Sequence, residues 1–85
     1  MLKVLLIDDE QRATDALRLM IVKTIPEIDE IMVCNDARQA AEKIHQFQPG
    51  LVFLDIQMPH LNGFKKKKKI PNKNFKIIFT TAYNE

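Results

Sequence analysis

The sequence predicts an α/β layer fold in which a mostly parallel sheet carries helices between its strands. Short apolar runs alternate with segments whose apolar residues recur at helical spacing, the connections are short, and no segment repeats another. This alternation favours a parallel sheet with right-handed crossovers. The 85 residues are therefore expected to form one domain, residues 1–85.

The first two predicted elements are a strand and a helix. The run "KVLLID", residues 3–8, ends abruptly in carboxylates, which is typical of a strand buried on both faces of a parallel sheet. The spacing then becomes helical and predicts a helix over about residues 11–25, closed by Pro26. Its apolar stripe comprises Ala13, Ala16, Leu17, Met20 and Ile21.

The next elements repeat this order. Residues 30–35, "EIMVCN", predict a second strand, and Asp36 with Gln39 three residues later fits the N-cap and capping box of a second helix. A third strand is predicted at residues 51–55, "LVFLD", and a fourth at residues 75–80, "FKIIFT". The inner stripe of the second helix is predicted to be Ala37, Ala40, Ala41, Ile44 and Phe47, and the breaker Gln48-Pro49-Gly50 follows it.

The third crossover contains five consecutive lysines, Lys65 to Lys69. A helix there would have Lys66 and Lys67 on its inner face, where burial of a charge is costly. Without these lysines the net charge of +2 becomes −3, so the chain is otherwise mildly acidic. Three interpretations stay open: a polybasic patch for nucleic acid or anionic lipid, an exposed and poorly ordered helix, or an engineered or misassigned stretch in place of an amphipathic sequence. We favour the last.

Composition excludes several classes of protein. No apolar stretch approaches the roughly 18 residues that span a membrane, and no signal peptide is recognisable, so we expect a soluble protein without membrane contact. The single Cys34 favours a reducing, cytoplasmic location and a small core residue. The sequence contains neither the Gly-x-Gly-x-x-Gly motif nor the P-loop motif of nucleotide-binding proteins. His45 and His60 lack metal-ligand spacing and are expected at the surface.

Carboxylates end two of the predicted strands: Asp8 and Asp9 follow the first, and Asp55 ends the third. If the strand order is 2-1-3-4, these strands are neighbours and their carboxylates meet beyond the carboxyl edge of the sheet. Their mutual repulsion predicts a hard cation such as Mg²⁺. The alternative is that they simply cap helices and end strands. A phosphatase of the haloacid dehalogenase type is disfavoured, because Gln57 stands where its second Asp is needed.

With these motifs the chain resembles the receiver domain of two-component response regulators. The resemblance rests on "IDDE", on "LVFLD" followed by "IQMPHLNG" with Met58, Pro59 and Gly63, and on "IIFTTA" with Thr81 before Ala82. The segments "DIQMPHLNGF" and "FTTAYNE" are most similar to regulators with a LytTR-type DNA-binding output domain. The resemblance implies a flavodoxin-like three-layer sandwich with a parallel sheet in the order 2-1-3-4.

The resemblance also implies roles for individual residues. Asp55 would accept a phosphoryl group from a sensor histidine kinase or a small phosphodonor, and Thr81, rather than Thr80, would contact that group. Mg²⁺ would be held by Asp9, by Asp55 and by the backbone carbonyl of Gln57, with Asp8 acting largely through bound water. Such a protein is a signalling protein rather than an enzyme, at most catalysing its own phosphorylation and dephosphorylation.

A complete receiver continues beyond a fourth strand, so the chain is expected to represent the N-terminal two-thirds of the domain and to lack its last strand and helices. The family's phosphate-binding lysine and aromatic switch residue are missing with them. An unprotected strand at residues 75–80 would then favour a homodimer or a domain swap. DNA contact would need an output domain. The rival functions are an inactive structural or dimerisation module and, more weakly, a lysine-driven nucleic-acid binder.

Overall fold

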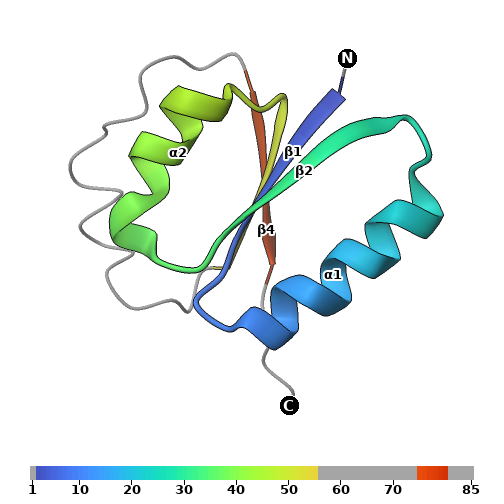
Figure 1. Cartoon of the computed structure of the whole chain (residues 1–85), viewed down its shortest axis with the longest axis horizontal. Helices are drawn as coiled ribbons and strands as arrows, with labels where there is room; N and C mark the ends of the chain where they lie inside the picture. The colour runs from blue at the N-terminus through green and yellow to red at the C-terminus, as the bar shows by residue number, and fades with distance from the viewer. Residues whose placement is uncertain (1, 56–74, 81–85) are drawn as a thin grey trace.

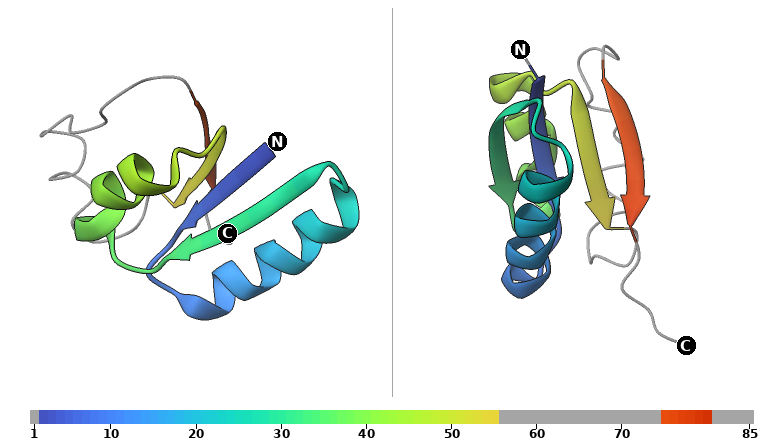
Figure 2. Two further views of the ribbon diagram at one scale, coloured as in Figure 1. Left: turned by 45° about the horizontal axis from the view of Figure 1, so that its top comes forward. Right: turned by 90° about the vertical axis from the view of Figure 1, so that its right-hand side faces the viewer.

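Four parallel strands form the centre of the molecule: β1 (Leu2–Ile7), β2 (Ile28–Cys34), β3 (Leu51–Asp55) and β4 (Lys76–Thr80). The structure, a computed structural model, describes residues 2–55 and 75–80. The strand order is β2-β1-β3-β4, as the sequence predicts, with β1 and β3 adjacent at the centre. Figure 2 shows the strands side by side, with β2 and β4 at opposite edges of the described sheet.

Two helical segments lie on opposite faces of this sheet, giving three layers (Figure 1). Helix α1 (Gln11–Thr24) covers one face. The 3₁₀ turn η1 (Ala37–Gln39) and helix α2 (Ala40–Phe47) cover the other. The three-layer arrangement and the order of the four strands confirm the predicted fold class. The predicted third-crossover helix and the lysine block, Lys65 to Lys69, lie outside the described residues.

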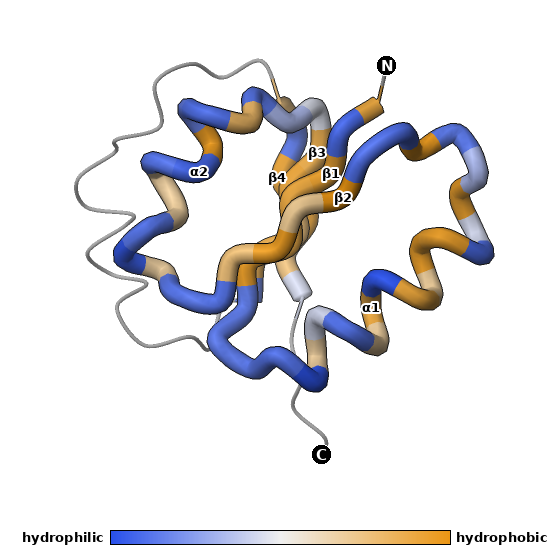
Figure 3. The backbone as a smooth tube through the Cα atoms, viewed as in Figure 1, coloured by the Kyte–Doolittle hydropathy of each residue, from blue (hydrophilic) through white to orange (hydrophobic). Residues whose placement is uncertain are grey.

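The central strands β1 and β3 are mostly apolar, as Figure 3 shows, because helices cover both sides of the sheet. Residues Val4, Leu5, Leu6 and Ile7 of β1 are at most 1% exposed. Alternate residues of β1 face opposite layers. Leu5 and Ile7 pack in the core beneath α2, and Val4 and Leu6 pack with Ile21 of α1. The strand that leads into the loop at Asp8 and Asp9 is therefore held from both faces of the sheet.

The prediction for the buried face of α1 was partly wrong. Leu17 and Ile21 pack against the sheet, and Thr14 is fully buried, but Ala16 is exposed and Met20 is 60% exposed. The physical reason is that α1 packs on β1 and β2, so only a narrow strip of the helix faces the sheet. The face that carries Ala16 and Met20 is left uncovered by the described residues.

The predicted inner stripe of the second helix is confirmed. Ala37, Ala40 and Ile44 are buried, and Ala41 and Phe47 pack against them. Asp36 begins this segment as predicted, accepting a hydrogen bond from the backbone N–H of Arg38, although the first turn is 3₁₀ rather than α-helical. Helix α2 ends at Phe47, whose carbonyl oxygen accepts a bond from Nζ of Lys3.

Element boundaries agree with the predictions to within two residues. The third strand has the predicted bounds, whereas β2 begins two residues earlier than predicted and ends at Cys34 rather than Asn35. Cys34 is a buried free thiol, and His45 is exposed, both as predicted; His60 lies outside the described residues. In the described part of the chain, neither helix has the length and apolar character needed to span a bilayer.

Candidate metal centre at the carboxyl edge of the sheet

Three aspartates meet where β1 and β3 end. Asp8 and Asp9 begin the loop between β1 and α1, and Asp55 is the last residue of β3. One carboxylate oxygen from each lies within 4.8 Å of the other two. Asp55 is only 6% exposed, Asp8 is half-buried and Asp9 is exposed. The predicted convergence of the three carboxylates is thus confirmed, since adjacent parallel strands deliver their last residues to the same edge.

The alternative that Asp9 only caps the following helix does not fit the local geometry. The N-cap of α1 is Glu10, and its side chain makes no capping hydrogen bond. The backbone N–H of Glu10 instead donates to Oδ1 of Asp8, at 3.0 Å. Asp8 therefore stabilises the turn into the helix, and the carboxylate of Asp9 is not needed for capping.

The crowding of carboxylates changes the protonation of Asp8. Its pKa is raised from 3.8 to about 6, first by partial burial and then by the charges of Asp55 and Asp9, with a hydrogen bond to Asp55 adding to the increase. The bond from the Glu10 N–H acts in the opposite direction and lowers the pKa. The neighbouring charges of Asp55 and Asp9 thus disfavour the ionised form of Asp8, and a bound cation would oppose this effect.

The donor set suits a hard divalent cation. Carboxylate oxygens are the protein ligands that Mg²⁺ prefers. Because a bound Mg²⁺ ion usually keeps several of its water ligands, few protein ligands are needed. The predicted fourth ligand, the backbone carbonyl of Gln57, and the predicted phosphoryl contact, Thr81, lie outside the described residues. Thr80, the residue before it, pairs with Asp55 in the sheet register.

The structure also reveals two polar residues beside this site that the sequence did not single out. Nδ2 of Asn35 donates to the backbone carbonyl of Asp8 at 2.7 Å and lies 3.4 Å from Oγ1 of Thr14. Thr14 is the most deeply buried polar residue of the described chain. The available signal in the sequence was that Asn35 follows a strand ending at the same edge of the sheet.

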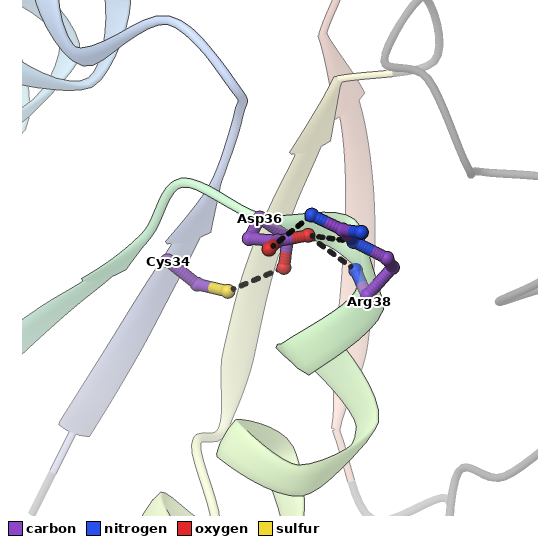
Figure 4. A network of polar contacts seen from close by, with 3 residues as sticks. All are labelled: Cys34, Asp36 and Arg38. Carbon is purple, nitrogen blue, oxygen red and sulfur yellow. Dashed lines mark hydrogen bonds and ion pairs between the residues drawn. The ribbon is translucent and has the colours of Figure 1, made fainter.

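The segment after β2 is held by a compact network of polar contacts (Figure 4). The Cys34 thiol donates to the backbone carbonyl of Asp36, and burial is the main reason that the pKa of this thiol is raised. The guanidinium of Arg38 contacts both carboxylate oxygens of Asp36, each at 3.1 Å. The segment therefore has several independent restraints close to the acidic site.

Known proteins are similar to this chain in sequence and in fold. The response regulator receiver domain family matches residues 4–85. The chain is 40% identical to the sensory transduction protein LytT of Bacillus cereus and 35% identical to the transcriptional regulatory protein BtsR of Salmonella typhimurium. Both matches include all of this chain, but it spans only 35% and 36% of the lengths of these relatives.

A solved structure agrees in fold. The MaeR response regulator bound to beryllium trifluoride superposes with a TM-score of 0.76 at 23% identity, covering all of this chain and 70% of the MaeR chain. At this identity the similarity concerns the fold alone. It nevertheless agrees with the parallel sheet and with the family match over nearly the whole sequence. The chain belongs to the response regulator receiver domain family.

Proposed function

We propose that this chain is a phospho-accepting receiver of a bacterial two-component system, with Asp55 as the acceptor and a sensor histidine kinase as the donor. One observation carries the proposal: the carboxylate of Asp55 is buried at a strand end with the carboxylates of Asp8 and Asp9 within 4.8 Å. Family membership supports the same role. The MaeR coverage supports a further proposal, that residues 1–85 correspond to the N-terminal two-thirds of a receiver domain.

The proposed reaction is a phosphoryl transfer to a carboxylate. An oxygen of Asp55 attacks phosphorus, a new P–O bond forms, and the P–N bond of the kinase phosphohistidine breaks. The electron pair of the broken bond leaves with the imidazole nitrogen. A small acyl phosphate can replace the kinase, in which case a P–O bond breaks and a carboxylate departs. The protein contributes mainly by positioning the nucleophile and by managing charge.

The proposed cation site consists of Asp9, Asp55 and the backbone carbonyl of Gln57 as direct ligands, with Asp8 acting largely through bound water. Mg²⁺, when bound, neutralises the phosphoryl oxygens and orients the transfer. Thr81 is proposed to donate a hydrogen bond to a phosphoryl oxygen. The fit between three clustered carboxylates and a hard cation supports this assignment.

The proposed biological role is control of transcription by a signalling protein rather than an enzyme with a separate substrate. The names of the relatives, sensory transduction protein LytT and transcriptional regulatory protein BtsR, support this role. Contact with DNA would be made through an output domain of the LytTR type, and not through this chain. A cytoplasmic location fits a receiver that meets a kinase domain and a DNA-bound output domain.

The direct test is phosphate uptake measured by intact-mass spectrometry. Wild-type protein incubated with Mg²⁺ and acetyl phosphate is expected to gain the mass of one phosphoryl group. Asp55→Asn should gain none, because the amide oxygen is a poor nucleophile. Asp15→Asn, on the exposed side of α1, is the matched control and should take up phosphate like the wild type. Uptake that persists in Asp55→Asn, or that never occurs in the wild type, contradicts the proposal.

A second candidate function is an inactive receiver module that keeps the fold and acts through dimerisation. It is favoured by β4, which pairs only with β3 among the described strands and exposes 44% of Ile78 and 54% of Phe79. An apolar strand with one free edge can pair with the same strand of another copy. A homodimer is also compatible with phosphorylation, so only the mass measurement separates the two candidates.

A further inference from the structure

Both backbone groups of Asp8 are held by the end of β2. The N–H of Asp8 donates to the carbonyl of Cys34 at 3.1 Å, which continues the pairing of β1 with β2 by one bond. The carbonyl of Asp8 accepts a 2.7 Å bond from the Asn35 side chain. Because a carbonyl can only accept, this side chain must present its nitrogen to Asp8. The consecutive residues Cys34 and Asn35 thus both hydrogen-bond to Asp8, the first residue of the loop at residues 8–10, which we call the acidic loop.

The second of these bonds fixes the orientation of a peptide plane. The carbonyl of Asp8 belongs to the planar unit that joins Asp8 to Asp9. Holding this oxygen toward Asn35 therefore restricts the direction in which the chain leaves Asp8, and with it the position of the Asp9 side chain. Among the described residues, no side chain hydrogen-bonds to the Asp9 carboxylate in a comparable way.

Thr14, which contacts the Asn35 side chain that bonds to Asp8, is itself held in place. Oγ1 of Thr14 donates to the carbonyl of Gln11 at 2.9 Å and lies within acceptor reach of the Asn35 amide. Thr14 is fully buried, so its hydroxyl cannot turn to water instead. On the other side of Asn35, the contacts of Cys34 and Arg38 with Asp36 hold the backbone (Figure 4). The exposed Asn35 side chain is therefore held by Thr14 of α1, and the backbone that follows it is held by the contacts of Asp36.

We propose that Asn35 is a positioning residue for the cation site: through the Asp8 carbonyl it holds the acidic loop closed before the cation binds. Three carboxylates this close repel one another, and an untethered loop would relieve that repulsion by moving Asp9 outward. The bond from Asn35 opposes that movement, so less binding free energy is spent on assembling the site. This inference rests on the proposed cation-dependent receiver function.

The test is the affinity for Mg²⁺ alone, measured by isothermal titration calorimetry. Asn35→Ala is expected to raise the Mg²⁺ dissociation constant about 3- to 10-fold, which corresponds to the net contribution of one hydrogen bond. Gln46→Ala is the matched control, since it removes an exposed amide that, within residues 2–55 and 75–80, bonds only to Glu42 on α2. Its dissociation constant should equal that of the wild type. Equal affinities for all three proteins overturn the proposal.

A measurement on the wild type removes any dependence on variant folding. In an NMR titration, the side-chain amide of Asn35 is expected to shift on addition of Mg²⁺ with the same midpoint as the backbone N–H of Asp9. The side-chain amide of Gln46 should not move. A role confined to joining two loops would leave the Asn35 signal unchanged while that of Asp9 shifts, and this result also overturns the proposal.

The positioning role of Asn35 and the receiver function can be tested separately. If the wild type binds Mg²⁺ and takes up phosphate but Asn35→Ala binds equally well, only the positioning role is wrong. If the wild type shows no Mg²⁺ binding in either experiment, both the positioning role and the proposed function are wrong.

Discussion

Asp8 shows the combined effect of burial and of the carboxylates that meet where β1 and β3 end. Its half-buried carboxyl lies beside Asp55 and Asp9, and its pKa is raised to about 6. The strand-end positions of these residues could be read from the sequence, because each follows an apolar run of parallel-strand character. The role of Asn35 could not. A single polar residue after a strand has no distinctive pattern, and its partner is a backbone atom 27 positions earlier.

The raised pKa of Asp8 predicts a pH dependence of stability in metal-free buffer. The folded protein keeps the Asp8 proton up to about pH 6, whereas the unfolded chain loses it near pH 3.8. The folded state thus binds more protons between these values, and this contribution to stability, present below pH 3.8, is lost as the pH rises through 6. Asp8→Asn removes this pH-dependent loss of stability, because the asparagine side chain does not ionise. The variant should therefore have a higher Tm than the wild type at pH 7.

Thermal unfolding followed by circular dichroism in EDTA, from pH 4 to pH 7, measures this effect. Asp15→Asn serves as the control for removing an exposed carboxylate, and its Tm should follow the wild-type pH profile. If the Tm of Asp8→Asn falls with pH in parallel with that of the wild type, Asp8 is not the group that causes the loss of stability.

At the scale of elements, helix α2 followed its apolar pattern while α1 did not. The stripe from Ala37 to Phe47 lies in the core, but Ala16 and Met20 of α1 are exposed. Periodicity identifies a helix reliably but cannot show how wide a strip of it the sheet covers. That width depends on how many strands lie beneath the helix, which for α1 are β1 and β2. The end of α2 carries a second feature that the sequence did not reveal.

Gln48 ends α2 in the left-handed region, with φ 52° and ψ 60°. Glycine adopts this conformation without the penalty of about 1–2 kcal/mol that other residues bear, and it adds about 0.4–1 kcal/mol of unfolded-state entropy. Gln48→Gly should therefore stabilise the fold by roughly 0.5–1 kcal/mol, which raises Tm by several degrees in a chain of this size. Thermal denaturation measures the change.

Gln46→Gly is the matched control for this prediction. Gln46 lies within α2, where glycine costs about 0.5–1 kcal/mol relative to a helix-forming residue. The two substitutions should thus shift Tm in opposite directions. A lower Tm for Gln48→Gly would mean that its side chain contributes more than the backbone conformation costs.

At the scale of the whole molecule, the order of the strands was predictable because parallel pairing and right-handed crossovers leave few arrangements. Whether an edge strand pairs with a further strand was less predictable, since this depends on which other segments lie beside it. Among the described strands, β4 has β3 on one side, and two of its apolar side chains are about half exposed. This edge is the natural place for contact between copies of the chain.

We expect wild-type protein to form a dimer with a concentration-dependent mass in size-exclusion chromatography with light scattering. Phe79→Lys should shift the equilibrium toward monomer, because a charge on an edge strand opposes edge-to-edge pairing. Leu19→Lys, on the exposed side of α1, places the same charge on a 66% exposed apolar residue and should leave the dimer intact. A wild-type mass that stays monomeric at all concentrations contradicts edge pairing.

The central claim is that Asp55 accepts the phosphoryl group in a site completed by a cation. The most direct measurement is borohydride reduction after incubation with acetyl phosphate, which converts a phosphorylated aspartate to homoserine, followed by peptide mass mapping. We expect homoserine at position 55 when Mg²⁺ is present and none when EDTA replaces it. Homoserine at position 8 or 9, or equal conversion of Asp55 with and without Mg²⁺, would show that Asp55 is not a cation-dependent acceptor.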